Sequence, residues 1–102
     1  SPALLVLKAQ IQLTRLENTA RAAELYREAW DAGGPYYAAR IHAELLRRMD
    51  RQEEAYAFLT DLYPKLPADS VYAQRGVVLE RIRELEQELG IPAHQRFVPE
   101  RN

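Results

Sequence analysis

Few residues in this chain have a type and a spacing that could do chemistry. The two histidines, His42 and His94, lie far apart, and neither has a second histidine at the His-Glu-x-x-His spacing of a zinc site. His42 falls on the apolar side of a helical pattern, which favours a core histidine over a metal ligand. The serines, Ser1 and Ser70, stand outside any Gly-x-Ser-x-Gly setting, so a serine nucleophile has no support.

Two further patterns have ordinary structural interpretations. Gly33-Gly34 lacks the Lys-Ser or Lys-Thr of a phosphate loop, and it comes where a helix is expected to end. Three glutamates recur at four-residue spacing, which is typical of a solvated helix face; they are Glu80, Glu84 and Glu88. The chain has no cysteine, which excludes disulfides and thiolate chemistry. We therefore expect no enzyme activity, no metal and no cofactor.

The composition is that of one globular domain. The 102 residues carry 14 basic and 15 acidic side chains, so no overall bias toward nucleic acid or an anionic membrane is present. No run of about 18 apolar residues occurs, and no membrane insertion is expected. The chain begins with serine and shows no intact signal peptide, so we expect a processed chain or an excised fragment. For the compartment, the cytoplasm is favoured and a bacterial periplasm stays open.

The centre of the chain, residues 36–66, is predicted to form two helices that meet at Met49-Asp50-Arg51. In each half, small and apolar residues recur at three- and four-residue spacing, which places them along one side of a helix. They are Ala39, His42, Ala43, Leu46 and Met49 in the first half, and Ala55, Phe58, Leu59, Leu62 and Leu66 in the second. Asp50, with Glu53 three residues later, predicts an N-cap and its capping-box partner.

The helices before this pair have equally clear limits. The first is expected over about residues 3–16 and is apolar on more than one side, which predicts neighbours on most sides. We expect further repeats before it in a longer chain; the alternative is that it packs against both helices of the next hairpin. Asn18 or Thr19 can cap the second helix, and Gly33 suits its left-handed end.

The last helix is predicted over residues 71–89. It has a narrow apolar line and a polar opposite side, and Gly90 and Pro92 end it. Residues 93–102 have no helical period and are expected to form a flexible C-terminal tail.

A shift of 33 positions brings parts of the sequence into register. Leucines coincide at positions 13, 46 and 79, and arginines coincide at positions 15, 48 and 81. Self-similarity at this period is typical of stacked repeats, in which no single unit can bury its own apolar face.

At these residues the chain resembles the tetratricopeptide repeat family. The second unit has Ala43 at the expected helix crossing and then Ala55, Leu59, Leu62 and Pro67; the first has Ala22, Tyr26 and Ala29. Gln10 departs from the small residue of the family pattern, and Val6 replaces its early tryptophan. The resemblance implies an all-α, right-handed superhelix over residues 1–92, with units at about 3–35 and 36–67 and a capping helix at 69–89. Other helical repeats or an irregular bundle are the alternatives.

In this family the first helix of each unit lines a concave groove. Carried over by position, the resemblance implies a groove formed by Leu7, Ile11, Arg15, Tyr37, Arg40, Glu44, Arg47, Arg48, Val77 and Arg81. Such a groove is apolar at its start and cationic further along, which suits an amphipathic or acidic peptide. The arginines have a second interpretation, in which each pairs with a nearby glutamate or interacts with a helix C-terminus.

Two functions follow as expectations. The first is a non-catalytic scaffold or adaptor that binds a protein or peptide in this groove. The alternative is self-association, as a homodimer or as a docking module of a larger protein, through Leu4, Leu5 and Val6 of the exposed apolar first helix. RNA binding is disfavoured because the charge is nearly neutral and no groove combines aromatic with basic residues.

Overall fold

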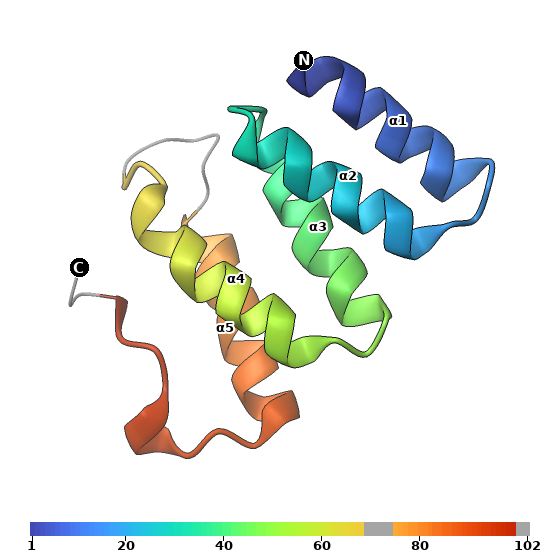
Figure 1. Cartoon of the computed structure of the whole chain (residues 1–102). Coiled ribbons are helices and arrows are strands. Elements are labelled where there is room, and N and C mark those ends of the chain that lie inside the picture. Colours follow the sequence, from blue (N-terminus) through green and yellow to red (C-terminus); the bar gives the residue numbers. More distant parts are fainter. Residues whose placement is uncertain (69–74, 100–102) are drawn as a thin grey trace. The chain divides into compact units, whose positions relative to one another are not determined.

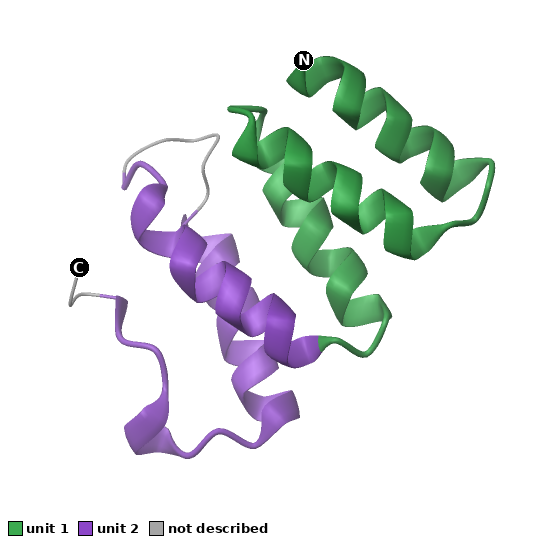
Figure 2. Ribbon diagram, in the orientation of Figure 1, with its two compact units in different colours: residues 1–51 green, residues 52–102 purple. Residues whose placement is uncertain are grey.

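The computed structural model describes residues 1–68 and 75–99, and in these residues it contains five α-helices, two short 3-10 helices and no strand (Figure 1). The chain divides into unit 1, residues 1–51, and unit 2, residues 52–102 (Figure 2). Unit 1 contains three helices, α1 (Pro2–Thr14), α2 (Thr19–Asp31) and α3 (Tyr36–Arg48). Unit 2 contains α4 (Gln52–Leu62), η1 (Tyr63–Lys65), α5 (Arg75–Leu89) and η2 (Ala93–Gln95). The predicted all-α class is confirmed.

Side-chain caps start the first two helices. The Ser1 hydroxyl accepts a hydrogen bond from the Leu4 N–H at 3.3 Å. The Asn18 side chain accepts one from the Arg21 N–H at 3.1 Å, which confirms the predicted cap of α2. Each contact pairs one of the backbone donors that the first turn of a helix leaves without a partner.

Three helices end in the same way. After α2, α3 and α5 one residue has a positive φ: Gly33 at 87°, Asp50 at 58° and Gly90 at 66°. In each case this residue and the next donate their N–H groups back into the last turn, as Asp50 does to Arg47 and Arg51 does to Leu46. The prediction of Asp50 as the N-cap of α4 is therefore wrong, because Asp50 ends α3 and α4 begins at Gln52.

The core of unit 1 forms where α2 packs on both α1 and α3. Many of its buried residues are alanines, whose small side chains let helices approach closely; the cluster is Val6, Ala9, Ala22, Ala23, Leu25, Tyr26, Ala29, Ala38 and Leu45. A polar contact joins α3 to α2, because the Nδ1 atom of His42 on α3 lies 2.7 Å from the Ala23 carbonyl oxygen on α2. A carbonyl can only accept, so Nδ1 carries the proton and donates it. The prediction of His42 as a core histidine is confirmed.

In unit 2, α4 packs on α5. Leu62 ends α4 and Pro64 follows in η1, as expected of a proline that cannot continue a helix. The buried apolar side chains of α5 are Val78, Ile82 and Leu85, and the same helix buries one carboxylate completely, that of Glu86.

The predicted repeat units, about 3–35 and 36–67, stay a prediction. The contacts of the chain divide it into residues 1–51 and 52–102. The flexibility predicted for residues 93–102 also stays a prediction, and residues 100–102 lie outside the described residues. Phe97 contacts α5 and η1 through both its backbone and its ring. The predicted single helix at 71–89 is present as α5 from Arg75, with no break before Gly90; residues 71–74 lie outside the described residues.

Candidate partner-binding surface

The outward side of α1 is apolar. Leu4, Leu7 and Ile11 are 49%, 51% and 40% exposed, and their spacing of three and four places them on one stripe. Val6 and Ala9, on the opposite side of the helix, are buried in the core of unit 1. An exposed stripe of this kind on a helix that is already packed on one side is typical of an interaction surface.

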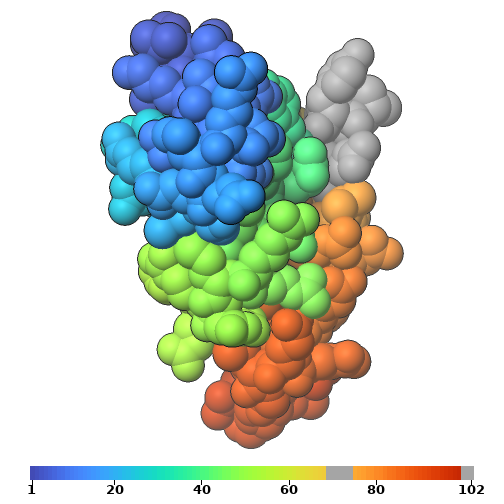
Figure 3. Space-filling model, turned by 90° about the vertical axis from the view of Figure 1, so that its right-hand side faces the viewer, coloured from blue at the N-terminus to red at the C-terminus, as the bar shows by residue number. Residues whose placement is uncertain are grey.

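Basic side chains lie beside this apolar stripe, and α1 contains no acidic residue. Lys8 and Arg15 are exposed and lie within about 60° of Leu4 around the helix axis, by the 100° step of an α-helix. Residues 2–14 include no Asp or Glu. The outward side of α1 therefore combines aliphatic side chains with positive charge. Figure 3 shows the N-terminal residues, in blue, on the face turned toward the viewer.

The outward side of α3 carries half of the predicted groove residues. Tyr37 is 41% exposed, Arg40 and Arg48 are exposed, and Glu44 and Arg47 are half-buried. The opposite side buries Ala38, Ala39, His42, Ala43, Leu45 and Leu46. The predicted division of this helix into an inner and an outer side is therefore confirmed.

The predicted arginines differ in how they are paired. Within residues 1–68 and 75–99, the structure shows no ion pair within 4.0 Å for Arg15, Arg40 or Arg48. Arg47, by contrast, interacts with another group of the protein. Arg81, on α5 in unit 2, contacts Glu84 at 3.0 Å and is half-buried. The interpretation of a local ion pair thus holds for Arg81. Val77, the other predicted residue on α5, is also half-buried.

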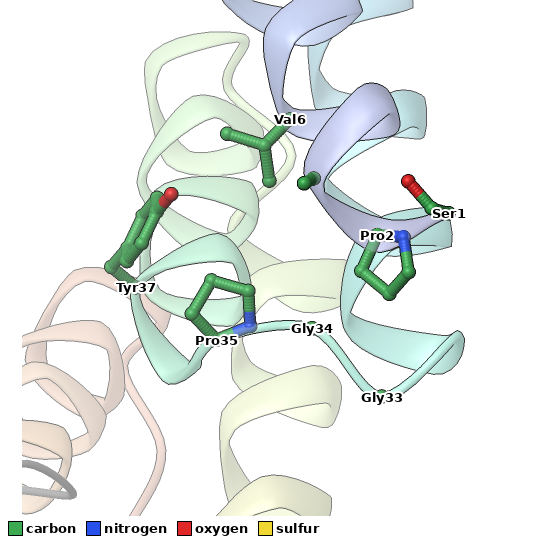
Figure 4. A pocket seen from close by; sticks show the side chains of 8 residues that line it. Ser1, Pro2, Val6, Gly33, Gly34, Pro35 and Tyr37 are labelled. Carbon is green, nitrogen blue, oxygen red and sulfur yellow. The ribbon is translucent and has the colours of Figure 1, made fainter.

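A shallow open pocket of about 440 Å³ lies beside the start of α1 (Figure 4). Its walls come from the start of α1, the loop between α2 and α3, and the start of α3, through Ser1, Pro2, Ala3, Val6, Gly33, Gly34, Pro35 and Tyr37. Gly34 allows the loop to pass close to α2, because a Cβ atom there would lie 2.5 Å from the Ala29 carbonyl oxygen. The pocket therefore joins Tyr37 of α3 to the N-terminal end of α1.

The residues predicted for self-association have different environments. Leu4 is exposed, Leu5 packs against the core of unit 1, and Val6 is only 5% exposed within that core. Including Val6 in an exposed face was wrong, because it faces α2 rather than solvent. Leu7, which is 51% exposed, is the accessible apolar side chain next to Leu4 that the prediction left out of this face.

A second cluster in unit 2 was missed from the sequence. Glu86 is 0% exposed and accepts hydrogen bonds from Tyr56 Oη at 2.8 Å, Arg83 Nη1 at 2.8 Å and the Phe97 N–H at 2.7 Å. Burial acts to raise the pKa of Glu86, but the hydrogen bonds from Arg83, Phe97 and Tyr56 outweigh it and hold that pKa below its ordinary value. A signal for this cluster exists, since Glu86 follows Leu79 by seven residues and Ile82 by four and so continues their apolar line.

No family model, curated protein or solved structure matches the chain. Among the described residues, no helix combines the length and apolar character needed to cross a membrane. The same residues contain no group of three or more acidic, histidine or cysteine side chains that could hold a metal ion.

Proposed function

We propose that this chain is a non-catalytic protein-interaction module that binds an acidic amphipathic peptide on the outward sides of α1 and α3. In this proposal the helices form a tetratricopeptide-like right-handed superhelix whose first helices line the binding groove. The observation that carries the proposal is the combination of exposed aliphatic side chains on α1 with exposed arginines on α3, Arg40 and Arg48, that form no ion pair with any described residue.

The chemistry of this surface selects the kind of peptide. Leu4, Leu7 and Ile11 offer aliphatic contact to an apolar side chain, whose burial contributes roughly 25 cal/mol for each Å² removed from water. Arg40 and Arg48 offer planar donors that match the geometry of a carboxylate, and no acidic partner among the described residues has to be displaced from them. A peptide that alternates aliphatic with acidic residues can contact the aliphatic side chains of α1 and pair with the arginines of α3.

A peptide selection tests the proposal directly. The chain is immobilised and a random peptide display library is panned against it, and we expect enriched peptides with Asp or Glu beside Leu, Ile or Phe. The selected peptides should lose binding to the Arg40→Glu/Arg48→Glu variant. They should keep binding to Arg21→Glu/Lys65→Glu, which changes the net charge equally at two exposed cations of α2 and η1. Enriched peptides without acidic residues, or binding that survives the first variant, would contradict the proposal.

Self-association is the second candidate, and the exposure of Leu4 and Leu7 favours it. Two copies that pair their α1 helices would bury these leucines against each other. Sedimentation over a wide concentration range should then show a dimer that the Leu4→Glu/Leu7→Glu variant abolishes. Leu16→Glu, at an exposed leucine beyond the end of α1, is the matched control and should leave the dimer intact. A monomer at every concentration removes this candidate.

A further inference from the structure

The segment after α5 turns back along unit 2 (Figure 1, red). Phe97 contacts the rest of the unit through its backbone and its ring. Phe97 donates its N–H to Glu86 at 2.7 Å and accepts at its carbonyl from Arg83 Nη1 at 2.9 Å. Its ring meets the Tyr63 ring edge-on, with centroids 5.5 Å apart. We call Glu86, Arg83 and Tyr63 the Phe97 socket.

The other residues of this segment contribute little to its attachment. None of residues 91–99 is buried, and Val98 is 44% exposed. The hydrogen bonds of residues 92–96 stay close in sequence, from Gln95 N to Pro92 O, from Arg96 N to Ala93 O and from Arg96 Nε to Ile91 O. The segment is thus a self-contained turn that enters the socket with one aromatic residue.

Each group of the socket also has a partner other than Phe97. Glu86 keeps its hydrogen bonds with Tyr56 and Arg83, both at 2.8 Å. The Arg75 guanidinium lies 4.9 Å from the centroid of the Tyr63 ring and helps to hold that ring in place. These contacts do not involve Phe97, and a site whose groups are already held binds with a smaller loss of entropy than one that must be assembled.

The socket contacts Phe97 through its backbone and its ring. Glu86 accepts from the N–H of Phe97, Arg83 donates to its carbonyl, and Tyr63 contacts its ring; every residue type except proline has such an N–H. Arg96, the residue before Phe97, has an extended backbone. We propose that the Phe97 socket is a binding site for an extended segment of a partner protein that carries a phenylalanine, and that residues 91–99 occupy it as an internal competitor. This site lies in unit 2 and is independent of the surface on α1 and α3.

A labelled peptide with the sequence of residues 90–99 tests the proposal on the full chain. In the wild-type chain the tethered Phe97 competes at an effective concentration in the millimolar range, so the peptide should bind weakly. The Phe97→Ala variant empties the socket and should bind the peptide at least about tenfold more tightly. Adding Arg83→Met to that variant should weaken binding again, because the carbonyl of the peptide loses its donor.

Matched peptides and a second variant keep the test decisive. A peptide with alanine in place of Phe97 should not bind, whereas one with alanine in place of the exposed Val98 should bind unchanged. Phe97→Leu, which keeps an apolar side chain but no ring, is titrated in parallel in case Phe97→Ala reduces helicity, and it should also bind more tightly than wild type. The proposal would be overturned if wild type and both Phe97 variants bound the peptide with equal affinity, or if neither variant bound it saturably. It would also be overturned if the peptide with alanine in place of Phe97 bound as well as the unchanged peptide. A peptide-independent dimer of the wild-type chain that disappears in Phe97→Ala would assign the socket to a second copy instead and would also overturn it.

Discussion

Replacing Glu86 tests the contacts of a carboxylate that unit 2 buries completely. Glu86→Leu removes the acceptor of three hydrogen bonds, from Tyr56, Arg83 and the Phe97 N–H. Hydrogen bonds to a charged group contribute about 1.5–3 kcal/mol each when partly buried. Arg83 is 41% exposed, so water replaces its lost partner at little cost and its bond counts for less. The variant also no longer has to bury a charged carboxylate, and this gain offsets part of the loss from the bonds to Tyr56 and Phe97. We therefore expect the free energy of unfolding to fall by about 2–3 kcal/mol.

Urea unfolding followed by far-UV circular dichroism measures this loss. Glu80→Gln, at an exposed carboxylate of the same helix, is the matched control and should change the free energy of unfolding by less than about 0.5 kcal/mol. If Glu86→Leu is as stable as this control, the hydrogen bonds of Glu86 contribute no net stability and the reasoning is refuted.

The pH dependence of stability gives an independent check of the same contact. The pKa of Glu86 is lowered in the folded chain from 4.5, so its contribution is present above pH 4.5 and is lost as the pH falls through the lower folded value. Glu86→Gln should therefore flatten the acid limb of the stability curve, and an unchanged acid limb would contradict the assignment.

Three further predictions concern unit 1. Asp50→Gly should raise the free energy of unfolding by about 0.5–1 kcal/mol, because glycine adopts the φ of 58° without strain; a loss of stability in urea unfolding would contradict the left-handed cap. Gly34→Ala should lower the melting temperature more than Gly76→Ala, where a Cβ atom meets nothing within 4 Å, and equal melting temperatures would argue against the close approach to α2. Burial lowers the pKa of His42 below 6.5. The free energy of unfolding should therefore fall by up to about 1.4 kcal/mol per pH unit as the pH drops below 6.5. In urea unfolding at several pH values, His42→Asn should remove this slope and His94→Asn should keep it.

Much of unit 1 was predictable because its signals are local. The spacing of small and apolar residues located α1, α2 and α3, and it also separated the buried side of α3 from the side with Tyr37, Arg40 and Arg48. Gly33 and Asn18 marked the ends of α2 because a left-handed end and a side-chain cap depend on single residue types.

The failures come from contacts that sequence spacing does not encode. Asp50 has the residue type of an N-cap, but the turn places it at the end of α3, where aspartate also tolerates a positive φ. Glu86 looks like one more surface glutamate of α5 until Phe97 returns from eleven positions later to donate to it. The segment after Gly90 has no helical period, so its spacing could not indicate the contacts that Phe97 makes with Glu86, Arg83 and Tyr63.

The central claim, an acidic peptide held on the outward sides of α1 and α3, is tested most directly by titrating one selected peptide with three chains. These are the wild type, Arg40→Glu/Arg48→Glu and the charge-matched control Arg21→Glu/Lys65→Glu. We predict that the dissociation constant rises at least about tenfold for the first variant, a loss of about 1.4 kcal/mol, and stays within about twofold for the control. Equal dissociation constants for the two variants, with helicity unchanged in both, would contradict the claim.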